Sequence, residues 1–163
     1  MLDIVEDWQK IRRHFSNSFG SSLHVAIASI SADGEPTNTP IGTLFLDKDQ
    51  TSGFYFEKFP SKLPRSAIEN SRICVLAVYS SKVFWIKSLL SIKFSSYPAI
   101  KLYGNLGVQR TATAKELRAL RRRMRFLSFT GGYKYLWVDM TQVREVNFSQ
   151  AEKIELGKMT AGL

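Results

Sequence analysis

The sequence predicts a mainly β protein whose antiparallel strands form a closed or partly closed barrel with flanking helices. Short segments rich in β-branched and aromatic residues recur along the chain, and turn signals separate the first three of them. The strand–helix alternation of parallel sheets is missing, so neighbouring strands are expected to pair as hairpins. The 163 residues and the 44% apolar content suit one domain, which we expect over residues 1–163.

The first element is expected to be a helix within residues 1–20. Apolar side chains recur there at spacings of four, three and four, on one stripe: Ile4, Trp8, Ile11 and Phe15. Asp3 and Glu6 resemble a capping box at its start. The basic residues 12–14 are expected on the exposed side of this helix.

Residues 23–31 and 37–46 are expected to form a hairpin. The first segment alternates apolar positions, and Asp33-Gly34 between the two segments is a strong hairpin-turn signal. Pro40 cannot donate to a strand ladder, so the second strand should lie at an edge or bulge there. Gly42 allows another group to approach its backbone closely.

The next stretch combines an aromatic strand at residues 54–56, a turn at Ser61 and a short helix expected over residues 63–70. Lys62 and Arg65 stand at the start of that helix. Free N–H groups, the helix dipole and two cations together favour an anion such as phosphate. The alternative is an ordinary strand, turn and helix with solvated cations.

Residues 73–79 are almost continuously apolar and are expected to form a buried central strand. Cys74 is the single cysteine, so no disulfide framework exists; we expect a reducing, cytoplasmic location. His24 and Cys74 have no partners at metal-site or catalytic-triad spacing, so we expect no metal.

Residues 82–97 look like a helical insertion with three lysines, no acid and a broad apolar surface that includes Phe84, Trp85, Leu89, Leu90, Ile92 and Phe94. Such a helix is typical either of a membrane-surface element or of a lid or subunit contact, and we favour the second. No apolar run is long enough for a membrane span.

The remaining elements are a strand over residues 99–110, a helix over 113–127, and a last strand over 136–148 followed by a tail, 149–163. Thr113 and Glu116 form a capping-box pattern. The apolar residues of this helix are expected to form one buried stripe. Its arginines 118, 121–123 and 125 are expected to face solvent. The second half of the chain carries a net charge of +10 and the first half −1, which favours an anionic partner.

Taken together, these pieces resemble the flavin-binding split barrels related to pyridoxamine 5′-phosphate oxidase. The matching segments are HVAIASISADGEPTNTPIG, then FYFEKFPSKLPRSAIENSRICVLAV, then IKLYGNLGVQR, over about residues 23–148. The resemblance implies a split antiparallel barrel and a homodimer that holds flavin mononucleotide (FMN) at the subunit interface. We expect no nucleic-acid partner, for the reasons given below.

The resemblance assigns cofactor contacts residue by residue. The edge of the flavin ring would meet the second strand, and the ribityl chain would follow the aromatic strand. The phosphate would bind the turn after it, and a residue from the last strand of the partner subunit would close the site. The positions are Thr39, Pro40, Ile41, Gly42, Tyr55, Phe56, Glu57, Ser61, Lys62, Arg65 and Trp137.

The resemblance does not extend to the substrate. The arginine early in the second strand and the Arg-x-His segment near the C-terminus, with which pyridoxamine phosphate oxidases hold substrate, are both missing. We therefore expect an FMN-dependent oxidoreductase for another small molecule, with a reduced nicotinamide such as NAD(P)H as a candidate electron donor. The ring would carry the electrons, which explains why no catalytic side chain stands out.

Other functions stay open at this point. A flavin-binding or sensing module without turnover would have the same residues, and a deazaflavin or heme could occupy the barrel. A basic nucleic-acid-binding protein is the third possibility. It is disfavoured because the arginine-rich helix has few interleaved aromatic residues and no helix-turn-helix or zinc pattern is present.

Overall fold

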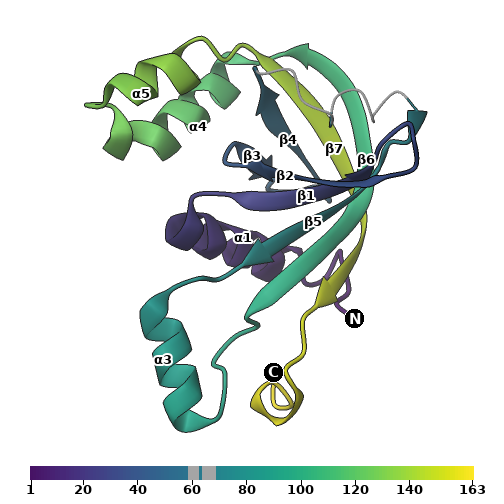
Figure 1. Ribbon diagram of the computed structural model, residues 1–163, viewed down its shortest axis with the longest axis vertical. Helices are drawn as coiled ribbons and strands as arrows, with labels where there is room; N and C mark the ends of the chain where they lie inside the picture. Colours follow the sequence, from purple (N-terminus) through teal and green to yellow (C-terminus); the bar gives the residue numbers. More distant parts are fainter. Residues whose placement is uncertain (59–62, 64–68) are drawn as a thin grey trace.

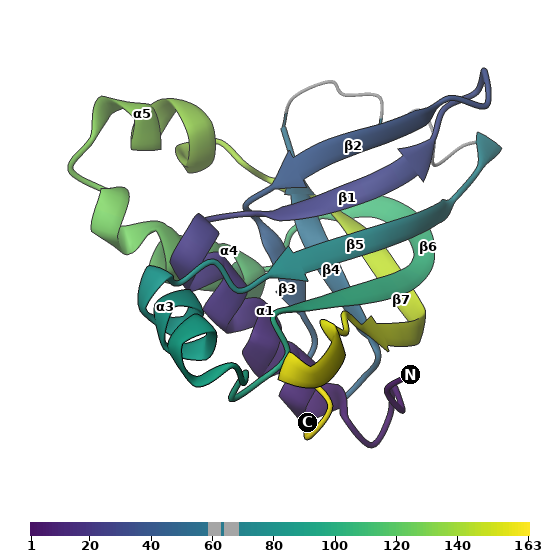
Figure 2. The ribbon, with the colours of Figure 1, turned by 60° about the horizontal axis from the view of Figure 1, so that its bottom comes forward.

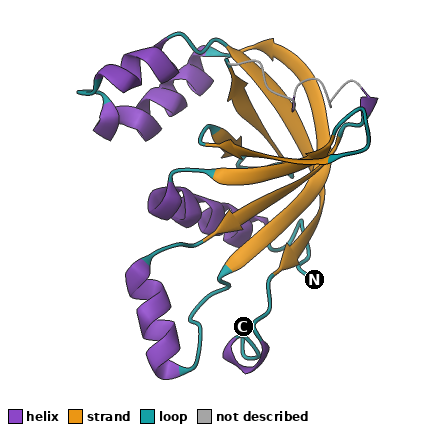
Figure 3. Ribbon diagram, viewed as in Figure 1, coloured by secondary structure: helices purple, strands orange, loops and turns teal. Residues whose placement is uncertain are grey.

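The computed structural model describes residues 1–58, 63 and 69–163. Within them, seven antiparallel strands form one strongly curled sheet with helices at its ends (Figures 1 and 3). The strand order is β2-β1-β5-β6-β7-β4-β3. The strands are β1 (Val25–Ile30), β2 (Pro36–Ile41), β3 (Leu44–Leu46), β4 (Ser52–Glu57), β5 (Arg72–Val78), β6 (Ala99–Thr111) and β7 (Gln142–Lys153). This partly closed barrel confirms the predicted fold class.

The helices are mostly short and lie outside the sheet. The regular ones are α1 (Trp8–Ser22), α3 (Lys82–Ser91), α4 (Ala114–Met124) and the single turn α5 (Gly131–Tyr133). Irregular turns follow at η1 (Arg125–Leu127), η2 (Lys134–Val138) and η3 (Gly157–Met159). In Figure 1, α4 and α5 lie above the sheet and α3 below it. No helix among the described residues is long and apolar enough to cross a membrane.

The expected strand over residues 37–46 is in fact two strands, and this break closes the barrel. β2 and β3 lie at opposite edges of the sheet, yet only Gly42 and Thr43 connect them. The sheet must therefore curl until its two edges meet. The Thr43 hydroxyl accepts a hydrogen bond from the Phe56 amide (3.2 Å) and donates one to its carbonyl (3.3 Å). At Gly42 a Cβ would lie 3.0 Å from the Leu23 carbonyl oxygen, so the predicted close approach is confirmed.

The β1–β2 hairpin forms as predicted. Ile30 pairs with Pro36, and Gly34 turns the chain with a φ of +79°. β2 is an edge strand, which explains how it tolerates Pro40. β5 lies between β1 and β6 and is the expected buried central strand.

Two apolar clusters stabilise the barrel. The larger one fills its interior and is covered by α1, which contributes Trp8, Ile11 and Phe15 (Figure 2). The smaller one lies outside β4, where Phe54 and Phe56 pack under Leu120 and Met124 of α4. Because the side chains of β4 alternate between the two clusters, this strand is buried on both faces.

The first helix differs from its prediction at both ends and on one face. It begins at Trp8, because the Asp3 carboxylate accepts hydrogen bonds from the Val5 and Glu6 amides in a separate turn before it. It continues to Ser22, beyond the expected end at residue 20. His14 was expected to be exposed but is buried, and its Nε2 lies 3.0 Å from the Ala77 carbonyl oxygen.

Burial lowers the pKa of His14 below its ordinary value of 6.5, and the bond to Ala77 opposes the shift only in part. The unfolded chain therefore binds a proton at a higher pH than the folded protein, so stability is full above about pH 6.5 and falls as the pH decreases toward the folded pKa. When the pH is lowered from about 7.5 to about 5, we expect the melting temperature of His14→Gln to fall less than that of the wild type. Thermal melts at both pH values measure this, with His24→Gln as the exposed control. Equal losses in wild type and variant would contradict the interpretation.

The insertion and the arginine-rich helix form, with corrected ends. α3 stops at Ser91, and the following chain returns so that Phe94 is buried beside Phe84. In α4 the predicted capping box is present, with Thr113 and Glu116 bonded to each other's backbone amides. The helix ends at Met124 rather than at residue 127, and Thr130 caps the short turn α5.

The last strand is shifted along the chain. It was expected over residues 136–148, but β7 begins at Gln142 and continues to Lys153, into the predicted tail. Residues 136–138 belong instead to the helical segment η2. In β6, Gly104 is needed because a Cβ there would lie 2.2 Å from the Asn147 carbonyl oxygen of β7.

Candidate functional site

A cavity of about 350 Å³ lies where the two edges of the sheet meet. Its walls come from β2, the Gly42-Thr43 connection, the end of β4 and the helical segment η2. Eight residues assigned to the cofactor line it: Thr39, Pro40, Ile41, Gly42, Tyr55, Phe56, Glu57 and Trp137. The structure thus brings together residues from three separate parts of the chain. The volume is in the range of about 300–1,000 Å³ that is usual for small-molecule sites.

One wall of this cavity offers backbone groups rather than side chains. β2 pairs with β1 on one side only, so the N–H and C=O groups on its other side are available for hydrogen bonds. An edge of this kind suits a planar ring whose rim carries both donors and acceptors.

Glu57 is held by three neighbours and is not free to act on a ligand. Arg144 of β7 donates to both carboxylate oxygens, at 2.6 and 3.2 Å. The Tyr55 hydroxyl donates at 2.6 Å and the Gln109 amide at 2.9 Å. Burial and the neighbouring Glu57 carboxylate raise the pKa of Tyr55, so its hydroxyl stays protonated. These two residues fix the wall of the cavity and do not supply an acid or base.

Trp137 reaches the cavity from a different element than expected. It lies in η2, not in the last strand, and lines the cavity of its own chain. It packs against Tyr133, with ring centroids 5.9 Å apart, and so belongs to the apolar cluster under α4. Leu136 and Met140 line the cavity beside it, and sequence reasoning missed both. The pattern LWVDM gave no sign of a helical turn, because it reads equally well as a strand.

The phosphate-turn residues Ser61, Lys62 and Arg65 lie outside the described residues. Lys58, which precedes that turn and was not predicted, lines the cavity. Its Nζ donates to the Tyr135 carbonyl oxygen and lies 4.0 Å from an Asp139 carboxylate oxygen. Lys58 therefore ties the end of β4 to η2 across the mouth of the cavity.

The other candidate residues lie elsewhere. His24 is exposed, and burial raises the pKa of the Cys74 thiol. No cluster of three or more potential metal ligands occurs in the part of the chain that the structure describes. Arg118, Arg121, Arg122 and Arg125 are exposed as expected. Arg123 is the exception, because its guanidinium is enclosed by Phe19 and Phe45.

Comparison with known proteins gives matches in structure alone. No known protein family and no curated protein matches the sequence. The structure is similar to HupZ of group A Streptococcus, with a TM-score of 0.59 and 13% identity over 96% of this chain and 97% of that one. It is also similar to an FMN-binding protein from Syntrophomonas wolfei, with a TM-score of 0.58 and 13% identity over 93% and 94% of the two chains.

A third similar structure is a protein of the pyridoxinephosphate oxidase family from Clostridium acetobutylicum. Its TM-score is 0.52, with 12% identity over 90% of this chain and 89% of that one. At such identities the likeness concerns the fold and not the activity. The resemblance seen in the sequence is confirmed at that level: this chain has the split-barrel fold found in FMN-binding and pyridoxamine 5′-phosphate oxidase-like proteins.

Proposed function

We propose that the protein binds FMN in the cavity between β2, β4 and η2 and acts as a flavin-dependent redox protein on a small molecule. The observation that carries this proposal is the convergence of eight residues, assigned as cofactor contacts from the sequence, on one cavity. The likeness in fold to an FMN-binding protein supports it.

The residues of the cavity fit such a cofactor. The open backbone edge of β2 at Thr39 to Gly42 would meet the donor and acceptor rim of the ring. Trp137 and Met140 would cover its apolar part. In the sequence, Ser61, Lys62 and Arg65 follow β4, and the resemblance assigns the cofactor phosphate to them. A bound flavin supplies hydride and electron transfer, so this chain would only have to bind, orient and shield it.

Flavin fits this cavity better than heme does. Neither of the two histidines of the chain lines the cavity, so the axial histidine that holds heme iron in globins and peroxidases is missing there. His14 is buried elsewhere against Ala77, and His24 is exposed.

The visible absorbance spectrum of the purified protein tests the proposal. We expect the absorbance bands of oxidised flavin, either directly or after FMN is added and excess removed. Bleaching of these bands by NADH or NADPH, followed by reoxidation with a substrate, would show turnover. Flavin that binds but is never reduced would favour a binding or sensing module, the second candidate function. A colourless protein that takes up no added flavin would refute both.

We also propose a two-fold homodimer, as the resemblance implies. Five large apolar side chains of α3 and its end are exposed, which is unusual surface for a monomer: Val83, Ile86, Leu89, Leu90 and Ile92. We expect sedimentation to show a dimer at micromolar concentration. Leu90→Lys should shift the equilibrium towards monomer, because it places a charge in an apolar contact. Val5→Lys, at an exposed apolar residue outside α3, serves as control. A monomeric wild type with flavin bound would count against the proposal.

A further inference from the structure

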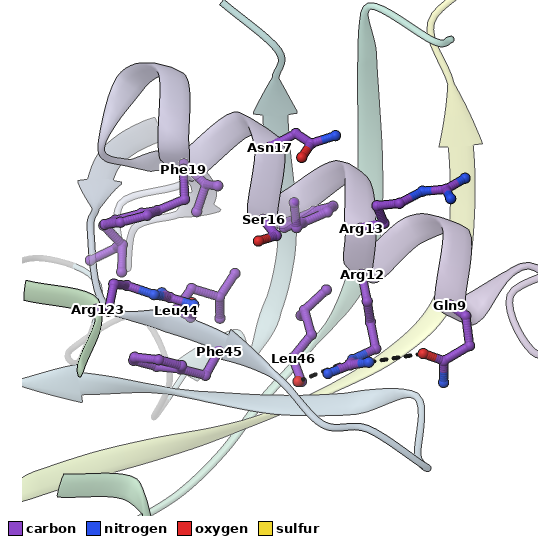
Figure 4. Close-up of a pocket in the computed structure, with 13 residues that line it drawn as sticks. Gln9, Arg12, Arg13, Ser16, Asn17, Phe19, Leu44, Phe45, Leu46 and Arg123 are labelled. Carbon is purple, nitrogen blue, oxygen red and sulfur yellow. Dashed lines mark hydrogen bonds between the residues drawn. The ribbon is translucent and has the colours of Figure 1, made fainter. Parts of the chain in front are cut away.

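A second cavity, of about 460 Å³, lies between α1, β3 and the end of α4 (Figure 4). Three arginines line it, and no acidic residue is among its described lining: Gln9, Arg12, Arg13, Phe15, Ser16, Asn17, Phe19, Val25, Ile41, Leu44, Phe45, Leu46 and Arg123. It shares only the wall residue Ile41 with the proposed flavin cavity. The proposed function assigns it no role.

Arg123 carries its charge in an unusual environment. Its guanidinium carbon lies 3.5 Å from the ring centroid of Phe45 and 4.6 Å from that of Phe19, so both of its faces are covered. One nitrogen donates to the Leu44 carbonyl oxygen. Burial lowers the pKa of Arg123 to about 10. Within the described residues no carboxylate lies within 4.0 Å of it.

The Arg123 guanidinium is partly buried, and a charge that is removed from water without a counterion is costly, so this arrangement favours an anion. The two covered faces leave only the planar edge of the guanidinium for a further partner. No fully buried side-chain nitrogen among the described residues lacks a hydrogen bond. The N–H groups of Arg123 beyond the one bonded to Leu44 are therefore accessible from the cavity, and a guanidinium edge matches the oxygens of phosphate or carboxylate.

Arg12 enters the same space from the α1 side. Its Nη1 donates to the Gln9 amide oxygen at 2.8 Å, and its Nε lies 3.5 Å from the Leu46 carbonyl oxygen. These contacts direct the Arg12 side chain across β3. Among the described residues, its Nη2 has no hydrogen-bond partner. In Figure 4, Arg12 and Arg123 reach beneath α1 from two sides, whereas Arg13 points away from them.

We propose that this cavity binds a small organic anion, an apolar body that carries one phosphate or carboxylate group. Arg123 and Arg12 hold the anionic group, and Phe19, Phe45 and Leu44 contact the apolar body. The site is separate from the proposed flavin site. Whether this cavity binds an anion therefore does not depend on whether the protein binds flavin.

Calorimetric titration of the full-length protein with phenyl phosphate and with phenylacetate tests the proposal. We expect saturable binding with one site per chain for at least one of these probes. Benzyl alcohol, which lacks the charge, and inorganic phosphate, which lacks the apolar body, should bind much more weakly. No saturable binding of either charged probe, or equal binding of benzyl alcohol, would overturn the proposal.

Two arginine variants locate the site. Arg12→Gln should raise the dissociation constant about ten- to a hundredfold, because it removes a charge-assisted bond. Arg122→Gln, an equal charge change on the exposed face of α4, should leave it unchanged. Equal weakening by both variants would show a general effect of net charge and refute the site.

Arg123 is tested without replacing it, because a variant there could fail to fold. In the wild-type protein, the NMR signals of the arginine Nε–H groups should shift on titration for Arg12 and Arg123. Those of Arg118 and Arg125 should stay in place. Riboflavin, which has no phosphate, should not displace phenyl phosphate. Shifts confined to exposed arginines, or displacement by riboflavin, would overturn the assignment.

Discussion

Replacing Arg144 by methionine is expected to lower the free energy of unfolding by about 3–5 kcal/mol, the range seen when one partner of a buried ion pair is removed. The side chains of Arg144 and Glu57 are only 12% and 6% exposed, and two hydrogen bonds join them. Without Arg144, the Glu57 carboxylate would keep only the bonds from Tyr55 and Gln109. Urea unfolding at neutral pH measures the loss.

Two further variants separate the effect of burial from the effect of charge on the free energy of unfolding. Arg110→Met removes an arginine that is also paired with two carboxylates, Glu116 and Glu145, but whose side chain is 34% exposed. Arg110→Met should lower the free energy of unfolding by only about 1 kcal/mol. The double variant Glu57→Leu/Arg144→Met, which leaves no unpaired charge, should be less destabilised than Arg144→Met alone. If Arg144→Met lowered the free energy of unfolding no more than Arg110→Met does, the prediction would be wrong. Water would then have to hydrate the Glu57 carboxylate in the variant.

Replacing Lys62 by alanine is expected to weaken FMN binding about ten- to a hundredfold. In the proposed site Lys62 contributes a charge-assisted bond to the cofactor phosphate, typically worth about 1.5–3 kcal/mol, whereas Ser61 contributes a neutral one of about 1 kcal/mol. Riboflavin lacks the phosphate and should bind the variant as well as the wild type. Titration with both flavins measures the difference.

The comparison of the two ligands excludes a folding defect, which would weaken both alike. Lys48→Ala, at an exposed lysine between β3 and β4, is the matched control and should bind FMN normally. If Lys62→Ala changed both affinities equally, or neither, the phosphate would bind elsewhere and the likeness of this turn to the family would be accidental.

Local sequence signals predicted most of the elements. The Asp33-Gly34 turn, the Thr113–Glu116 capping box and the apolar run of β5 each depend on neighbouring residues, and each is confirmed. The errors occur where distant contacts decide. Residues 37–46 read as one strand, and only the need to join opposite sheet edges breaks them at Gly42-Thr43. His14 looked exposed because its partner, Ala77, is 63 positions away.

Sequence reasoning selected residues that line one cavity, but it did not predict the contacts that hold them in place. Thr39 to Gly42 and Tyr55 to Glu57 were assigned from the resemblance, and they do line one cavity. Nothing local to Glu57 indicated that Arg144, 87 positions later, would occupy its carboxylate. Arg123 was grouped with the exposed arginines of its helix. The aromatic rings that enclose it, Phe19 and Phe45, come from other elements and leave no signal in its own segment.

The position of β7 has a consequence for how the chain acquires its fold during synthesis. β7 lies between β6 and β4 in the sheet, but residues 58–141 separate it from β4. As the nascent chain leaves the ribosome, the β3–β4 hairpin can form early, yet its long inner edge has no neighbour until residues 142–153 emerge. Until then two partial sheets with open hydrogen-bonding edges coexist, a state prone to pairing with other chains. The barrel is therefore completed by a late pairing between segments that lie far apart in the sequence. Such pairing is intrinsically slow, and we expect the nascent chain to be a client of chaperones.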